Sequence, residues 1–129
     1  MILRKYMSLL GIGAARVDLI LENNVFGPGE GVSGHFFIKG GTIEQKIKRI
    51  ECDLIQKNVI TNIESIVDSV TIFISRLIDS NEDNTMPFSF HLPNDIDVSN
   101  TELSYLFKTR LIFDEGMTSV DLDHIQIVE

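Results

Sequence analysis

Apolar side chains recur at every second position along much of this chain, which is the period of a β-strand with one buried face. In segment 15–22, Val17, Leu19 and Leu21 fall on one face, and charged residues fall on the other. Six later segments are also strand-like: 32–38, 46–60, 66–78, 87–92, 105–113 and 119–128. Segment 66–78 is rich in β-branched residues and apolar on both faces, as in a strand that is covered on both sides.

The alternation also assigns an inward face to these segments. The side chains expected to point inward together, segment by segment, are Val32, Gly34, Phe36 and Ile38; Ile50, Cys52 and Leu54; Phe88, Phe90 and Leu92; and Tyr105, Phe107, Thr109, Leu111 and Phe113. In the last segment, Val120 and Leu122 have one parity, whereas Ile125 and Ile127 have the other. A β-bulge between the two pairs would bring them to the same face, so we predict one there.

About seven strands separated by turn signals, without helical periodicity, predict an all-β fold. Two antiparallel sheets packed as a sandwich are the expected architecture. A chain of 129 residues suits one domain. We assign residues 15–129 to the sandwich and residues 1–14 to a lead-in, either a short helix or the approach to the first strand. The polar stretch 79–87 is expected to be a mobile loop.

The glycine-rich stretch 23–41 raises the question of a phosphate-binding loop. Gly29, Gly31 and Gly34 have the spacing of the dinucleotide fingerprint, but those glycines must open a helix, and the residues that follow here read as a strand. The Lys-Ser or Lys-Thr pair that a P-loop requires does not follow these glycines either. We therefore predict a tight β-hairpin, in which Pro28 presets φ, Gly29 accepts a positive φ, and Gly34 allows close packing across the sheet.

Charge is distributed unevenly along the chain. Residues 1–65 carry eight Lys/Arg and seven Asp/Glu, whereas residues 66–129 carry three Lys/Arg and twelve Asp/Glu. The net charge of −8 argues against a nucleic-acid partner, because an acidic chain repels a phosphate backbone. No apolar run approaches the roughly 20 residues that a membrane-spanning helix needs. We therefore expect neither nucleic acid nor an integral membrane segment among the partners.

The cysteine and the histidines indicate neither a disulfide nor a zinc site. Cys52 is the single cysteine, so the composition shows no disulfide framework of an oxidising compartment, and we expect a buried, inert thiol. His35, His91 and His124 have no second His or Cys at ligand spacing, which argues against a zinc site. No catalytic residue and no cofactor follow from these residues.

The acidic residues offer one weak metal candidate. Asp79, Asn81 and Asp83 match the first, third and fifth positions of a calcium loop, but the glycine and the bidentate glutamate of such a loop are missing. We therefore favour a solvated acidic loop. Four further acids are expected to be solvated turn residues: Asp114, Glu115, Asp121 and Asp123.

Several stretches carry a family resemblance. They are GIGAARVD at 11–18, PGEGVSG at 28–34 and GGTIEQKI at 40–47. Together they closely resemble the start of the bacterial sporulation-control family of arrestin-like proteins, the SpoOM family. MPFSFHLPNDIDVSN at 86–100 resembles the family's Phe-x-Leu-Pro segment, and the stretch from 106 to 128 also fits. The resemblance covers nearly the whole chain, and its first fifty residues are the most specific to the family.

The resemblance implies an immunoglobulin-like, arrestin-type sandwich in a cytoplasmic protein that binds other proteins and catalyses no reaction. Family members usually carry a second, similar sandwich, and Glu129 falls where the hinge to it would begin. The face left by that domain would be apolar, which favours a homodimer. Lys46, Lys48 and Arg49 would lie near the cationic face that arrestin-type domains use for acidic partners. The alternation places Lys46 and Lys48 on one side of their strand and Arg49 on the other.

Two functions from different classes remain open. The first is a non-catalytic regulatory module that binds proteins in the control of sporulation or of a related cell-state or stress response. Such a module could use a sheet edge or the loops at one end of the sandwich. The second is an acidic β-sandwich that binds a metal or another ligand and has hydrolytic activity. Only the acidic second half favours the second function.

Overall fold

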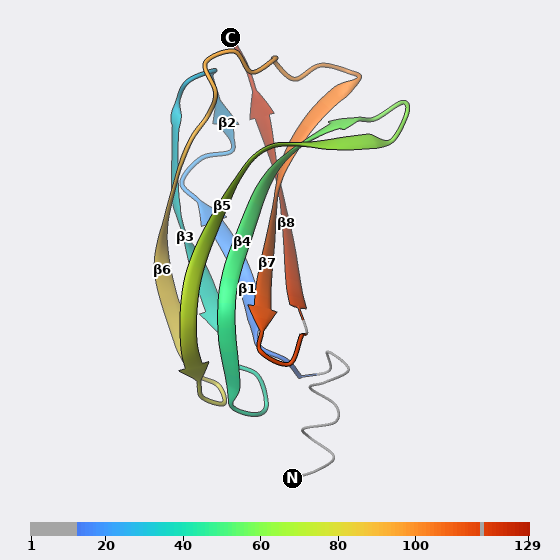
Figure 1. Ribbon diagram of the computed structural model, residues 1–129. Coiled ribbons are helices and arrows are strands. Elements are labelled where there is room, and N and C mark those ends of the chain that lie inside the picture. Colours follow the sequence, from blue (N-terminus) through green and yellow to red (C-terminus); the bar gives the residue numbers. More distant parts are fainter. Residues whose placement is uncertain (1–12, 117) are drawn as a thin grey trace.

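The computed structural model describes residues 13–116 and 118–129. Eight β-strands form this part of the chain, which confirms the predicted all-β class (Figure 1). Their bounds are β1 Arg16–Leu21, β2 Val25–Phe26, β3 Gly31–Lys39, β4 Gln45–Asn58, β5 Ile63–Ile78, β6 Asp83–His91, β7 Leu103–Phe113 and β8 Thr118–Ile127. No helix in the described part is long and apolar enough to cross a membrane. The proposed lead-in at 1–14 lies almost entirely outside the described residues.

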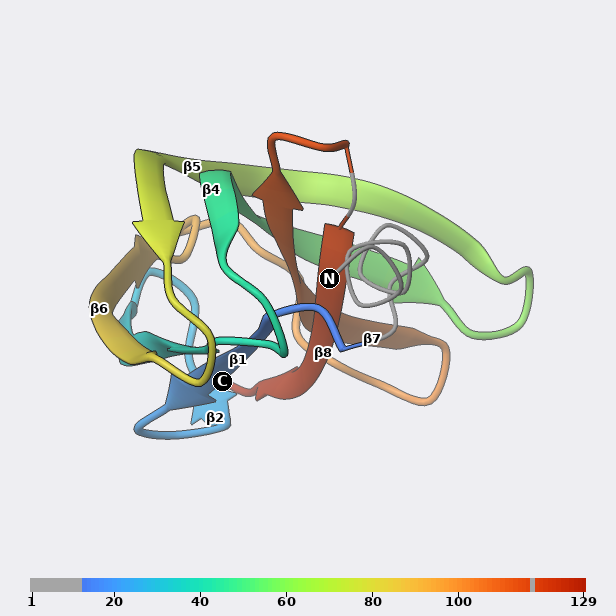
Figure 2. The ribbon, with the colours of Figure 1, turned by 90° about the horizontal axis from the view of Figure 1, so that it is seen from below.

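The strands form two sheets packed face to face. The smaller sheet has the order β1-β3-β6, and the larger has the order β2-β8-β7-β4-β5. Pairing is antiparallel except between the short β2 and β8. Figure 2 looks along the strands and shows the sheets as two layers of a sandwich. The apolar faces of both sheets are thereby removed from water, which is the main source of stability in such a fold.

The core follows the predicted alternation closely. The inward side chains predicted for segments 32–38, 50–54, 88–92 and 105–113 are buried, and Gly34 is half-buried. Four phenylalanines from three strands meet in edge-to-face pairs: ring centroids lie 5.2 Å apart for Phe36 and Phe88, 5.6 Å for Phe88 and Phe107, and 5.4 Å for Phe90 and Phe107. These rings link the two sheets at the centre of the sandwich.

The glycine-rich stretch forms a tight turn, but the predicted hairpin is wrong. Gly29 has φ 77°, and the Glu30 amide donates to the Gly27 carbonyl at 3.2 Å, so Pro28 and Gly29 occupy the central turn positions as expected. The turn joins β2 and β3, which belong to different sheets. β3 pairs instead with β1, and a Cβ at Gly34 would overlap the Ile20 carbonyl. The stretch is therefore a crossover between the sheets.

Three other local predictions need correction. Segment 66–78 is not covered on both sides, because β5 is the edge strand of the larger sheet and most of its side chains are exposed. The stretch 79–87 is not all loop, because β6 begins at Asp83 and a turn over 79–82 joins it to β5. The bulge predicted within the last strand is absent, since β8 pairs with β7 without a register shift. Val120 and Leu122 point outward and are about half exposed (50% and 54%), whereas Ile125 and Ile127 are buried. The residues of β8 that share the inward direction of Ile125 and precede it are therefore polar, namely Ser119, Asp121 and Asp123.

Candidate functional site: an acidic seam between the sheets

The polar inward positions of β8 lie where the two sheets meet at their edges. β1 is an outer strand of the smaller sheet, and β8 pairs with β2 only through Gln126 and Ile127. Over the rest of its length β8 has β7 as its single partner strand among the described residues. β1 and β8 approach one another there without pairing. We call this place the β1–β8 seam and define it by Asp18 and Leu19 of β1 and Asp121 and Asp123 of β8.

Strand geometry brings the acids of the seam together. Asp121 and Asp123 are opposite Thr109 and Phe107 of β7, whose side chains are buried, so period two turns both carboxylates inward. Asp18 projects from the edge strand β1. One carboxylate oxygen from each of the three residues lies within 4.8 Å of the others. The sequence prediction that Asp121 and Asp123 are solvated turn acids is therefore wrong.

One hydrogen bond crosses the seam directly. The Leu19 amide donates to Oδ2 of Asp121 at 2.8 Å. This amide lies on the edge of the smaller sheet, where none of the described strands supplies a carbonyl acceptor. The Asp121 carboxylate takes that role, and so ties the edge of the smaller sheet to the inward face of the larger one.

The electrostatics of the seam favour bound protons. Burial, followed by the nearby Asp121 and Asp18 carboxylates, raises the pKa of Asp123 to about 8. Burial and the charge of Asp121 also raise the pKa of Asp18, while His35 opposes that rise. Oδ2 of Asp123 is buried and has no hydrogen-bond partner among the described residues. Ionising all three carboxyl groups this close together would cost free energy through charge repulsion. One carboxyl of the group therefore stays protonated near neutral pH.

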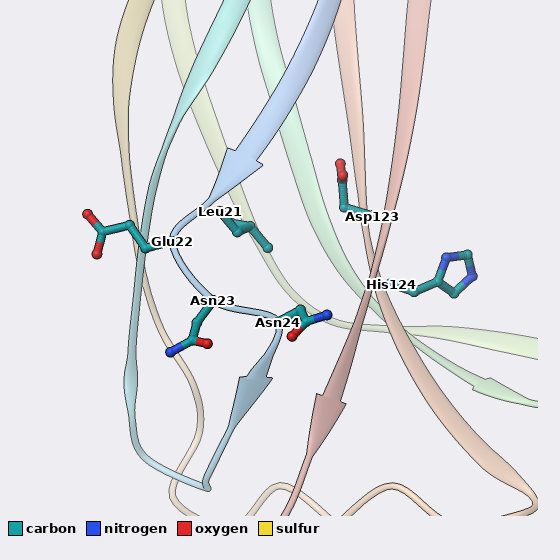
Figure 3. Close-up of a pocket in the computed structure, with 6 residues that line it drawn as sticks. All are labelled: Leu21, Glu22, Asn23, Asn24, Asp123 and His124. Atoms are coloured by element: carbon teal, nitrogen blue, oxygen red, sulfur yellow. The ribbon is translucent and has the colours of Figure 1, made fainter.

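A shallow hollow opens beside the acids. It measures about 420 Å³ and is lined by Leu21, Glu22, Asn23, Asn24, Asp123 and His124. Figure 3 shows that Asp123 and His124, although adjacent in β8, project in different directions. The hollow gives water a path to the edge of the seam, where Asp18 is exposed, while Oδ2 of Asp123 remains buried. Three carboxylates in such a place can hold a proton, or hard cations that prefer oxygen ligands.

The single cysteine lies next to this region. Cys52 is fully buried on β4, and the hydroxyl of Thr109 donates to its Sγ at 3.5 Å. Burial raises the pKa of the Cys52 thiol to about 11, and the nearby aspartates add to the shift. The thiol is therefore protonated at neutral pH, as expected for a structural rather than a nucleophilic cysteine.

The basic residues singled out in the sequence lie on the outer side of the larger sheet. Lys46 pairs with Asp114 at 3.7 Å, and Arg49 pairs with Glu51 at 2.6 Å. The register of β4 against β7 shifts between Ile47 and Arg49. That irregularity resets the alternation and turns Arg49 outward, so the predicted separation of Arg49 from Lys46 and Lys48 does not hold. Lys48 is exposed.

The weak calcium candidates stay a prediction. Asp79 and Asn81 lie in the turn before β6, and Asp83 is its first residue. The turn is built from backbone bonds, in which the amide of Asn81 donates to Gly41 and that of Glu82 donates to Asp79. Among the described residues, the acidic side chains whose oxygens lie close enough together to hold a metal ion are instead those of Asp18, Asp121 and Asp123. In the sequence, the inward direction of Asp121 and Asp123 could have been found by continuing the strand alternation without interruption through residues 119–127.

Comparison with known proteins places this chain in a family. The family model described as SpoOM protein matches residues 3–129. The chain belongs to the SpoOM family. A curated relative, the sporulation-control protein spo0M of Bacillus subtilis, is 33% identical in an alignment 128 residues long that covers 95% of this chain and 50% of the relative. The identification of a sporulation-control family from the sequence is thus confirmed.

A solved structure supports the same assignment. The crystal structure of the sporulation control protein Spo0M from Bacillus subtilis superposes with a TM-score of 0.82 at 33% identity. The match covers 92% of this chain and 51% of that one. This SpoOM-family chain therefore spans about half the length of the relatives that it matches, and its sandwich corresponds to part of a larger protein in those relatives.

Proposed function

We propose that this chain is a regulatory, non-catalytic module of sporulation control that works by binding another protein. Its membership of the SpoOM family and its likeness to a sporulation-control protein support the regulatory role. Support for a binding mechanism comes from the far end of the β4–β5 hairpin, which projects from the body of the sandwich in Figure 1. We define the hairpin tip as Val59, Ile60 and Ile63.

The hairpin tip is held rigidly by hydrogen bonds. Oδ1 of Asn58 accepts the amides of Ile60 and Thr61, both at 3.0 Å. The backbone carbonyl of Asn58 accepts the amide of Asn62 at 2.8 Å, and the carbonyl of Glu102 accepts that of Val59 at 2.9 Å. These bonds satisfy the polar backbone of the turn locally, as Asn side chains commonly do in tight turns. These hydrogen bonds favour the turn conformation seen in the structure.

The rigid tip presents apolar side chains to water. Val59, Ile60 and Ile63 are 48%, 70% and 66% exposed. Tight turns normally carry Gly, Asn, Asp or Ser, so aliphatic residues at these positions gain nothing from the turn itself. Exposed apolar groups on a preorganised element are typical of anchors that enter a partner's pocket, because little conformational entropy is lost on binding. This exposed, preorganised tip is the observation that carries the proposal.

The test compares two substitutions in the same turn. Ile60→Asp places a charge on the tip, while Thr61→Asp adds the same charge at the neighbouring exposed position. Each variant replaces the natural protein in its own host, and spore yield and timing are measured. We expect Ile60→Asp to reproduce the defect of a deletion, and Thr61→Asp to behave as the natural protein.

A cross-linker placed at residue 60 and at residue 61 gives an independent readout. The proposal requires one defined protein to be captured from position 60 and lost with Val59→Asp. Normal sporulation in the Ile60→Asp strain, at unchanged protein level, would contradict it. The alternative, a metal- or ligand-binding sandwich with hydrolytic activity, stays a prediction and is tested by the cation titration described below.

A further inference from the structure

We propose that the β1–β8 seam is a proton-operated latch, which is closed while the acidic trio holds a proton and opens at β1 when that proton leaves. The trio is Asp18, Asp121 and Asp123. The proposal concerns a conformational equilibrium of this sandwich and does not depend on which partner the hairpin tip binds.

The seam has the architecture that a latch needs. Within each sheet, neighbouring strands are joined by backbone hydrogen bonds. β1 and β8 belong to different sheets and are not paired in this way. The hydrogen bond from the Leu19 amide to Asp121 joins the two strands directly across the seam. Among the described residues β1 has one partner strand, β3, so it can move away from β8 without breaking a backbone ladder. Opening would expose the buried side chains of Val17 and Leu19, and its free energy lies below that of global unfolding because both sheets stay paired.

The charges at the seam oppose closure. The groups that face Asp123 are Asp121 on its own strand, Asp18 on β1 and the Cys52 thiol on β4. His35 on β3 acts on Asp18, and Glu22 and His124 line the adjoining hollow. The seam thus collects acids, and the cation nearest along β1, Arg16, is exposed at the start of the strand. A fully ionised trio would hold three like charges within a few ångströms, with the buried Oδ2 of Asp123 unpaired.

A proton removes that opposition. One protonated carboxyl can donate an O–H···O⁻ hydrogen bond to its neighbour, which spreads the remaining charge and satisfies the buried oxygen. When the pH rises, the proton passes to water or buffer, and no other bond is made or broken. The closed seam binds this proton more tightly than the open seam does, because opening lets the carboxylates separate and become hydrated. The raised pKa of Asp123 is consistent with this difference.

The sign of the pH dependence follows from the same linkage. An opened, hydrated aspartate titrates near its ordinary pKa of about 4, whereas Asp123 in the closed seam has a pKa of about 8. Between these values the closed form holds more protons than the open form, so closure weakens as the pH rises and levels off above about 8. Neutral pH lies inside this window, and small changes in cellular pH would shift the latch.

The test follows the Leu19 amide by hydrogen exchange. Its protection, corrected for the intrinsic exchange rate, is measured from pH about 5 to about 8 and compared with that of Leu54 in the centre of the larger sheet. We expect Leu19 protection to fall severalfold per pH unit, with about tenfold as the limit for one proton. Leu54 protection should stay constant. Equal protection of Leu19 at all these pH values would overturn the latch.

Two variants assign the effect to the trio. Asp123→Asn keeps the side-chain shape but removes the titration, so Leu19 protection should become independent of pH. Glu115→Gln, at an exposed turn position outside the trio, should leave the wild-type profile unchanged. If Asp123→Asn does not fold, Asp18→Asn replaces it, and its profile should be shifted to lower pH. A wild-type profile in either trio variant contradicts the proposal.

A cation titration separates a proton latch from a metal site. Calcium or magnesium chloride is added at millimolar concentration near pH 7.5, and Leu19 protection and the melting temperature are recorded. The latch predicts no specific effect beyond that of matched ionic strength. Strong stabilisation by either cation, lost in Asp123→Asn, would show that the trio is a cation site and would overturn the latch.

Discussion

β7 and β8 are neighbouring strands in one sheet, yet their inward faces differ in chemistry. On β7, Tyr105, Phe107 and Leu111 are completely buried. On β8, the residues opposite Phe107 and Leu111 are Asp123 and Ser119. The difference follows from position, because β7 is paired on both sides and β8 faces the seam along most of its length. Inward direction alone therefore does not make a position apolar, since access to water at the sheet edge also decides which residues are tolerated.

The largest change in stability should follow from removing the buried ring of Phe107 on β7. Phe107→Ala leaves a cavity under the rings of Phe88 and Phe90, and we expect a loss of about 3–5 kcal/mol in the free energy of unfolding. Urea unfolding monitored by circular dichroism measures it. A loss below about 1 kcal/mol would mean that the aromatic centre is not packed as described.

Replacing Asp123, which lies opposite Phe107, should increase the free energy of unfolding instead of lowering it. Since the folded pKa of Asp123 is raised to about 8, its ionisation destabilises the folded state increasingly from pH about 4 to about 8. Asp123→Asn should therefore gain about 1–2 kcal/mol over the wild type at pH 8, a figure reduced from the full shift because solvent screens the seam. The gain should shrink at pH 5. A gain independent of pH would contradict an origin in this ionisation.

The smallest effect is expected on the outward face of β8. Leu122 alternates with Asp121 and Asp123 and is about half exposed (54%), so Leu122→Ser should change the free energy of unfolding by less than about 0.5 kcal/mol. Thermal unfolding checks this value. A loss comparable to that of Phe107→Ala would show that the outward face of β8 is covered in solution.

Much of the fold could be predicted from the sequence because the core strands obey a simple alternation. The seven expected strands are all present, and the inward sets of β3, β4 and β7 are buried as predicted. The two-residue β2 was missed, since so short a strand leaves no periodic signal, and the pairing of β3 with β1 depends on contacts far apart in sequence.

The candidate site was harder to predict than the fold. The sequence prediction placed Val120 and Leu122 on the same face as Ile125 and Ile127, which required a bulge that the structure lacks. Keeping period two unbroken would have turned Asp121 and Asp123 inward with Ile125. Their approach to Asp18 could not be foreseen, because it depends on how the edges of two separate sheets meet.

The free edge of β5 has a consequence for solubility. A strand from Ile63 to Ile78 at the edge of a sheet is a template on which other chains could polymerise. Its pairing with β4 is irregular on either side of the run from Asp68 to Phe73, and Ser75 has φ 48°. These irregularities interrupt the flat edge and confine its regular part to the short run from Asp68 to Phe73, which makes it a poorer template for an incoming strand. Phe73, which is 79% exposed, lies at the end of the regular run.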